Sequence, residues 1–191
     1  MHSDITRIAL LVTQTLEQLG IPYAVGGSLA SSLHGIMRAT LDVDIVADMK
    51  LEHVEPLVAA LSKEFYADAG MMRGAIEHHR SFNLVNYETA FKVDIIIRRP
   101  RAFDGLQFER RKYSIITTDP EQGIYVASPE DTILTKLEWY RLGGEVSDRQ
   151  WRDILGVMKA RAGGLETDYL RQWAAELGVS DLLERALREV D

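Results

Sequence analysis

Apolar residues near the start of the chain recur every three or four positions, and shorter apolar runs follow them. The first pattern predicts an amphipathic helix over residues 4–19 that ends at Gly20. Its apolar stripe consists of Ile5, Ile8, Ala9, Val12, Leu16 and Leu19. The runs at 21–25 and 41–47 are too short for helices of this kind and predict strands.

The same reading of hydrophobic and polar positions predicts elements along the rest of the chain. Helices are expected from Ser28, with Leu29, Leu33 and Ile36 as the apolar stripe, and over 51–61 and 69–78. Further strands are expected at 65–66, 82–85, 91–97, 113–117 and 123–127, and the runs at 82–85 and 91–97 are expected to form a hairpin. The charged stretch that contains Phe103, Leu106 and Phe108 carries no predicted element.

The last third of the chain reads as helix alone, over 129–142, 148–161, 167–177 and 180–190. Strands and helices mix before it, so the fold class is α/β or α+β: a small mixed sheet flanked by helices, followed by a helical bundle. A length of 191 residues suits one domain, or one domain with a small appendage. We expect a core over 1–127 and a helical subdomain over 128–191.

Composition and charge narrow the classes of protein. The net charge of −7 argues against a general coat for nucleic acid. The chain has no cysteine, which excludes disulfides and thiolate zinc sites. No apolar run is long enough to span a membrane, and the first residues do not resemble a signal peptide. We therefore expect a cytoplasmic protein.

Two aspartates interrupt the predicted strand at 41–47. Because side chains two residues apart share one face of a strand, Asp42 and Asp44 project together, away from Val43 and Ile45. Two such carboxylates repel each other unless a cation lies between them or water surrounds them. Mg²⁺ prefers carboxylate, water and phosphate oxygens. The pair is either a metal site or a solvated strand end.

A third carboxylate, Asp94, lies in the apolar run FKVDIII. A charge in such a run needs a partner. If this strand neighbours the one that carries Asp42 and Asp44, three carboxylates meet, and such a set can hold two magnesium ions about 4 Å apart for phosphoryl transfer. The alternative is an edge aspartate that meets solvent or Arg98.

Gly26, Gly27 and Ser28 follow the strand expected at 21–25. A glycine turn that opens a helix exposes backbone N–H groups, which suit a phosphate. The Ser28 hydroxyl would bond either this phosphate or its own helix as an N-cap. The spacing of the glycines matches neither a Walker loop nor a dinucleotide fingerprint.

Together, these residues resemble the nucleotidyltransferases of the DNA polymerase beta superfamily. Val25-Gly26-Gly27-Ser28 followed by Asp42-Val43-Asp44-Ile45 matches the family pattern in order, type and spacing, and Asp94 matches the third carboxylate. GGSLASSLHGIMRATLDVDI, FKVDIII and SPEDTILTKLEWYRLGGEVSDRQWRDILGV resemble more narrowly the bacterial minimal nucleotidyltransferases, which include a group related to abortive-infection toxins of toxin–antitoxin systems.

The resemblance implies transfer of a nucleoside monophosphate from an NTP to a hydroxyl or phosphate acceptor, with release of pyrophosphate. Asp42, Asp44 and Asp94 would be catalytic and bind two Mg²⁺ ions, or Mn²⁺ in their place. Gly26, Gly27 and Ser28 would bind the triphosphate, and the helical subdomain would complete the cleft. The acceptor would be a small molecule, a protein side chain or an RNA end such as that of tRNA.

Four further residues are implied as nucleotide-binding. Arg38 would neutralise phosphate charge, or it pairs with Asp42. Lys136 would reach the triphosphate, supported by Arg149 and Asp153 from the next helix. Taken alone, Lys136 reads as a solvated helix lysine, and Arg149 with Asp153 as an ordinary pair four residues apart.

Other features are open to more ordinary readings. His78 and His79 lack the spacing of a metal site. A locally basic stretch would dock an anionic acceptor or form a solvated rim; it consists of Arg98, Arg99, Arg101, Arg110, Arg111 and Lys112. A cognate toxin- or antitoxin-type partner is a further expectation. The rival classes are a non-catalytic nucleotide-binding or antitoxin-like protein on the same fold, and a nuclease or phosphatase with a convergent carboxylate cluster.

Overall fold

The computed structural model describes residues 2–35 and 42–190. They form two compact units, Met1–Gly26 with Ala39–Val126 and Gly27–Arg38 with Ala127–Asp191. We call the first the sheet unit and the second the helical unit. The helical unit thus contains the segment after Gly26 as well as the last third of the chain, whereas the boundary expected from the sequence lies at 127/128 alone.

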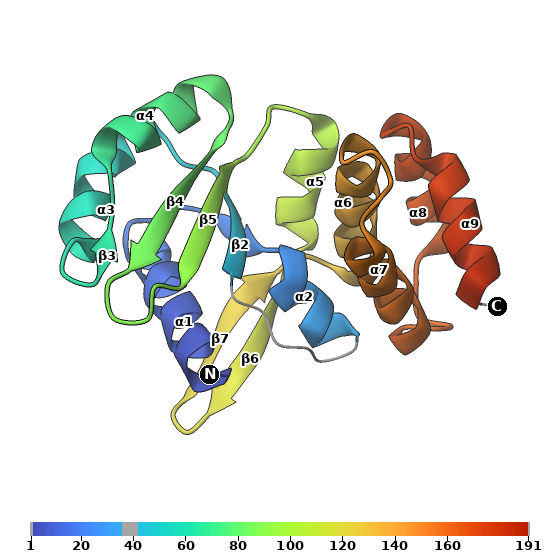
Figure 1. Cartoon of the computed structure of the whole chain (residues 1–191), viewed down its shortest axis with the longest axis horizontal. Helices are drawn as coiled ribbons and strands as arrows, with labels where there is room; N and C mark the ends of the chain where they lie inside the picture. Colours follow the sequence, from blue (N-terminus) through green and yellow to red (C-terminus); the bar gives the residue numbers. More distant parts are fainter. Residues whose placement is uncertain (1, 36–41, 191) are drawn as a thin grey trace. The chain divides into compact units, whose positions relative to one another are not determined.

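The sheet unit is built on a seven-stranded mixed sheet within the described residues, in the order β3-β4-β5-β2-β1-β7-β6 (Figure 1). β2 and β5 are parallel, as are β1 and β7, and the other neighbouring pairs are antiparallel. The strands are β1 (Tyr23–Val25), β2 (Asp42–Ala47), β3 (Phe65–Tyr66), β4 (Ser81–Asn86), β5 (Lys92–Ile97), β6 (Lys112–Thr118) and β7 (Glu121–Val126). Each lies where the sequence predicts a strand, and β4 and β5 form the expected hairpin.

Among the residues that the structure describes, five helical segments belong to the sheet unit. They are α1 (His2–Gln18), the 3-10 turn η1 (Leu51–His53), α3 (Val54–Leu61), α4 (Ala69–His78) and α5 (Ala102–Arg110). The buried residues of its predicted apolar stripe are Ile5, Ile8, Ala9, Val12 and Leu16, whereas Leu19, just beyond the helix, is half-buried. α1 contacts β2, β7 and α3. α1 therefore covers the face of the sheet on which Val43 and Ile45 are fully buried.

One helix of the sheet unit was not predicted. α5 begins after Arg101, which makes no side-chain capping hydrogen bond, and it buries Phe103, Gln107 and Phe108. The sequence signal failed because one of these buried positions is polar and no capping residue marks the start. Tertiary packing, rather than local pattern, selects this helix.

A buried tyrosine ties three elements of the sheet unit together. The Tyr23 hydroxyl donates to Glu17 at 2.7 Å and accepts from the backbone N–H of Tyr125 at 3.2 Å. Burial first, and then the hydrogen bond to Glu17, raise the pKa of the Tyr23 phenol above its ordinary value. The phenol thus stays neutral and joins α1, β1 and β7.

The helical unit consists of α2 (Gly27–His34), α6 (Pro129–Leu142), α7 (Asp148–Ala160), α8 (Thr167–Glu176) and α9 (Ser180–Val190). The last four match the expected helices within one residue at each end. Ser128 caps α6 by accepting from the N–H of Asp131, and Pro129 lies at its first position, as expected. Of the helices that the structure describes, none has the length and apolar character needed to cross a bilayer.

α2 differs from its prediction in the residues that it buries. Ser28, Ala30 and Ser31 are buried, whereas Leu29 and Leu33 are only half-buried; Ile36 lies outside the described residues. The hydroxyls of Ser31 and Ser32 donate to the carbonyls four residues earlier, so their polar atoms are satisfied within the helix. Small side chains let α2 pack closely on α6 and α7.

The closest approach of this packing is at Gly35, just after α2. A Cβ built there lies 3.0 Å from the backbone C of Gly156 and from the backbone N of Val157 in α7. Backbone atoms cannot move away as a flexible side chain does. We predict that Gly35→Ala lowers the free energy of unfolding by about 1–3 kcal/mol, as measured by urea denaturation.

Gly74, inside α4, is the matched control because nothing lies within 4 Å of a Cβ built there. Alanine is favoured over glycine inside a helix, so Gly74→Ala should be neutral or stabilise by up to about 1 kcal/mol. Equal effects of the two substitutions would show that Gly35 is not a close-packing position.

Candidate active site

The three predicted catalytic aspartates lie on two neighbouring parallel strands. Asp44 on β2 is directly beside Asp94 on β5, and Asp42 is beside Lys92. Residues paired across a sheet share a face, and so do residues two apart along a strand. Asp42, Asp44, Asp94 and Lys92 therefore project from one face of the sheet, opposite to buried Val43 and Val93, in two adjacent rows.

This face is polar and partly open to solvent. The side chain of Asp94 is 20% exposed, and its Oδ2 lies 3.1 Å from the Nζ of Lys92, which is 46% exposed. Arg98, the partner considered for Asp94 from the sequence, instead binds Asp48 at 3.1 Å. Lys92 is a residue of the site that the sequence analysis missed, because only the strand register shows that it stands beside Asp42.

As they stand in residues 2–35 and 42–190, no three His, Asp or Glu side chains are gathered into a set that could hold a metal ion. The donor chemistry of this face nevertheless fits Mg²⁺: carboxylates on adjacent strands, with room for water. A cation already contacts the face, and it is the ammonium of Lys92.

The glycine turn begins beside these strands. The N–H of Gly26 donates to the backbone carbonyl of Asp44 at 2.9 Å, which continues the pairing of β1 with β2. Gly26 thus cannot offer this N–H to a phosphate. Gly27 has a φ of +55°, a left-handed conformation that glycine adopts without strain. Gly27 and Ser28 begin α2, where the first N–H groups have no acceptor within the helix.

Ser28 is therefore not the N-cap that the sequence suggested, because it lies inside the first turn of α2. Its side chain is mostly buried, and its Oγ accepts from Nη2 of Arg149 on α7 at 3.5 Å. α2, α6 and α7 pack on one another, so the helical unit brings Ser28 and Arg149 together.

Lys136 of α6 and Asp153 of α7 form a buried ion pair. Their Nζ and Oδ2 atoms are 2.9 Å apart, and the two side chains are only 9% and 8% exposed. Lys136 is thus not the solvated lysine of the simpler reading. Asp153 pairs with Lys136 on the preceding helix, α6, which the spacing of Arg149 and Asp153 along α7 does not indicate. Arg38, the remaining nucleotide-binding candidate, lies outside the described residues.

The other candidates have structural partners. The Nδ1 atoms of His78 and His79 contact the carbonyl oxygens of Gly74 and Arg98 respectively, and His79 ends α4. In the basic stretch, Arg101 pairs with Asp104, and Arg111 bonds the carbonyl of Phe108 while its guanidinium also lies over the Phe108 and Tyr125 rings. Much of this basic stretch therefore serves the fold of the sheet unit.

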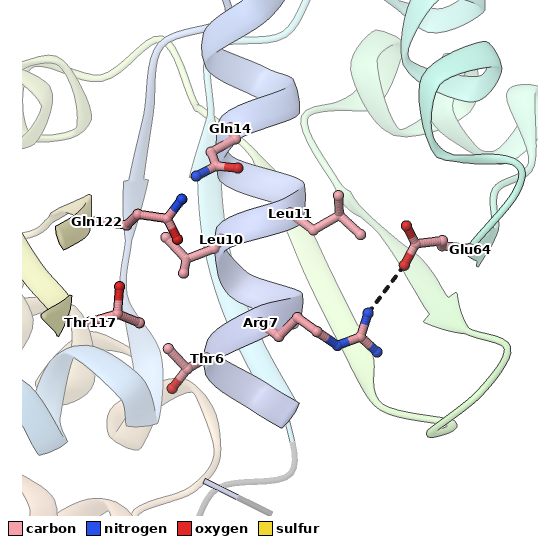
Figure 2. Close-up of a pocket in the computed structure, with 8 residues that line it drawn as sticks. All are labelled: Thr6, Arg7, Leu10, Leu11, Gln14, Glu64, Thr117 and Gln122. Atoms are coloured by element: carbon pink, nitrogen blue, oxygen red, sulfur yellow. Dashed lines mark hydrogen bonds and ion pairs between the residues drawn. The ribbon is translucent and has the colours of Figure 1, made fainter. Parts of the chain in front are cut away.

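A cavity of about 400 Å³ in the sheet unit lies along α1. Figure 2 shows Arg7 extended to Glu64 on one side of α1, with Gln122 and Thr117 on the other. The lining residues are Thr6, Arg7, Leu10, Leu11, Gln14, Glu64, Thr117 and Gln122. They include none of the predicted site residues, and their chemistry suggests no reaction.

Comparison with known proteins identifies the class of fold. The sequence matches no protein-family model and no curated protein at a significant level. The structure, however, has the nucleotidyltransferase fold, as expected from the sequence. It is similar to an antigenic nucleotidyltransferase-like protein from Paracoccidioides brasiliensis, with a TM-score of 0.58 and 20% identity over 97% of this chain and 93% of that chain.

An antibiotic-resistance factor and an antibiotic adenylyltransferase share the fold. The antibiotic-resistance factor ANT(2'')-Ia has a TM-score of 0.57 and 12% identity, over 99% of this chain and 100% of that chain. The lincosamide antibiotic adenylyltransferase LnuA, solved with lincomycin, has a TM-score of 0.52 and 15% identity, over 82% of this chain and 96% of that chain. At these identities the comparison establishes the fold; the narrower resemblance to abortive-infection toxins stays a prediction.

The buried pair of Lys136 and Asp153 gives a prediction on stability. Asp153→Ala leaves a buried ammonium without its carboxylate, which should lower the free energy of unfolding by about 3–5 kcal/mol in urea denaturation. Adding Lys136→Met to this variant removes the stranded charge and should recover most of the loss.

The control is Glu55→Ala, which breaks the pair with Arg73, whose side chains are 70% and 45% exposed. An exposed pair contributes about 1 kcal/mol at most. If Asp153→Ala cost no more than Glu55→Ala, the pair would not be a structural joint between α6 and α7.

Proposed function

We propose that the chain is a magnesium-dependent nucleotidyltransferase, which moves a nucleoside monophosphate from an NTP to a hydroxyl or phosphate acceptor and releases pyrophosphate. The observation that carries this proposal is the register of β2 and β5, which sets Asp44 beside Asp94 with Asp42 on the same face. The nucleotidyltransferase fold supports it.

Asp42, Asp44 and Asp94 would hold Mg²⁺, as two ions, with Mn²⁺ as a substitute. When bound, the metal would neutralise charge on the transferring phosphoryl group and help to activate the acceptor oxygen. Asp94 would also take the proton of the acceptor hydroxyl on its carboxylate. The partial exposure of these side chains leaves space for water and substrate oxygens at the same face.

The remaining residues would bind the nucleotide. The backbone N–H groups of Gly27 and Ser28 would donate to phosphate oxygens, while Gly26 anchors the turn to β2 through its bond to Asp44. Arg149, near Ser28, and Arg38 would offer guanidinium groups to the triphosphate. Lys136 would add positive charge from α6, held by Asp153.

The acceptor class follows from no residue of the site. LnuA is an antibiotic adenylyltransferase solved with lincomycin, and ANT(2'')-Ia has been solved with adenylyl-2''-tobramycin. These names support a small-molecule hydroxyl as the first acceptor to test, beside a protein side chain and a tRNA end. A toxin- or antitoxin-type partner and a cytoplasmic location remain part of the proposal.

The decisive test is transfer of radiolabel from α-³²P-NTPs with Mg²⁺ to a panel of antibiotics, proteins and tRNA. We predict that Asp42→Asn and Asp44→Asn each reduce transfer at least a hundredfold, because metal stabilisation of the transition state is worth several kcal/mol and each 1.4 kcal/mol is tenfold.

Asp48→Asn is the matched control, since Asp48 follows the end of β2 that is opposite to Asp42 and binds Arg98. This variant should keep transfer within a few-fold of the wild type. Transfer that survives loss of Asp42 and Asp44 would exclude this site. Saturable NTP binding without any pyrophosphate release would instead favour a non-catalytic nucleotide-binding protein.

A second prediction concerns the nucleotide. Arg149→Met should weaken binding of Mg·NTP about tenfold, measured by calorimetry, because a guanidinium–phosphate bond is charge-assisted. Arg152→Met is its control on the same helix, where the Arg152 Nε donates to the carbonyl of Asp148. Equal affinities for both variants would remove Arg149 from the nucleotide site.

A further inference from the structure

Lys92 stands among the three aspartates of the sheet face. It is the β5 neighbour of Asp42, and it lies two residues before Asp94, so all four side chains project from the same face. Its Nζ is 3.1 Å from the Oδ2 of Asp94. One row of this face thus pairs a carboxylate with an ammonium, and the next row pairs two carboxylates.

The second of these rows is electrostatically unfavourable by itself. Two carboxylates on adjacent positions of neighbouring strands repel each other, and Asp42 adds a third negative charge on the same face. Lys92 supplies the opposite charge at contact distance from one of them. Its stem is long and about half exposed, so the ammonium can leave Asp94 for solvent without a change in the backbone.

We infer that Lys92 is a positioning residue that holds the aspartates when no metal is bound and competes with Mg²⁺ for Asp94. This inference rests on the proposed function. A divalent ion bound by these aspartates takes over the role of the ammonium, and it has to overcome both the ion pair and the repulsion from the nearby positive charge. Lys92 therefore weakens the binding of free Mg²⁺ and stabilises the metal-free protein.

The experiment measures metal binding by the full-length chain without nucleotide, with Mn²⁺ followed by electron paramagnetic resonance and Mg²⁺ as its competitor. Removal of one positive charge a few ångströms from a divalent ion should tighten Mg²⁺ binding about tenfold in Lys92→Met. Lys92→Arg keeps the charge and should stay within about twofold of the wild type. Without metal, Lys92→Met should unfold at a lower temperature than the wild type. Addition of Mg²⁺ should remove this difference in unfolding temperature.

Lys112→Met is the matched control. Lys112 is an exposed lysine that begins β6, the edge strand of the same sheet, three strands from β2. Its loss should leave Mg²⁺ affinity within about twofold of the wild type. If Lys112→Met tightened binding as much as Lys92→Met, the effect would be one of net charge and the inference would be wrong.

The outcomes separate this inference from the proposed function. If the wild type binds Mg²⁺ and Lys92→Met binds it equally or more weakly, Lys92 does not compete with the metal, and the inference alone falls. If neither protein binds Mg²⁺ or Mn²⁺ saturably, while Asp42→Asn also changes nothing, the metal site falls and the proposed function with it.

Discussion

The parallel pairing of β2 with β5 is the constraint on which the chemistry of the molecule depends. It sets Asp44 against Asp94 and Asp42 against Lys92, and it buries Val43, Ile45, Val93 and Ile95 on the opposite face. A slip of one residue would exchange the two faces, placing carboxylates in the core and apolar side chains in solvent. Burial of the apolar face therefore fixes the position of the polar one.

Much of this arrangement follows from local sequence. The alternation of Asp42, Val43, Asp44 and Ile45 assigns opposite faces without knowledge of the fold. The helices after residue 128 follow from periodicity and from the glycine pairs that separate some of them. That β2 and β5 are neighbours does not follow from local pattern, because β3 and β4 lie between them along the chain. Asp94 was selected because a charge in an apolar run needs a partner. The resemblance to nucleotidyltransferases then matched it to the third carboxylate of that family.

The residues that sequence reasoning misread are those whose partners are distant. Lys92 was overlooked because its meaning depends on the register, and Lys136 reads as a surface lysine until α7 places Asp153 against it. α5 was missed because its buried side is partly polar. In α2, the sequence predicts that leucines are buried, yet small residues are buried instead because the neighbouring helices approach closely. Each case reflects a tertiary contact that overrides a local signal.

The division of the chain into units has a consequence for how the protein is made. α2 leaves the ribosome before the helices that it packs on, because α6 and α7 are more than ninety residues further along the chain. A helix of eight residues is not stable alone in water. α2 therefore cannot reach its packed state until α6 and α7 have been synthesised, and truncation before residue 128 would remove these packing partners.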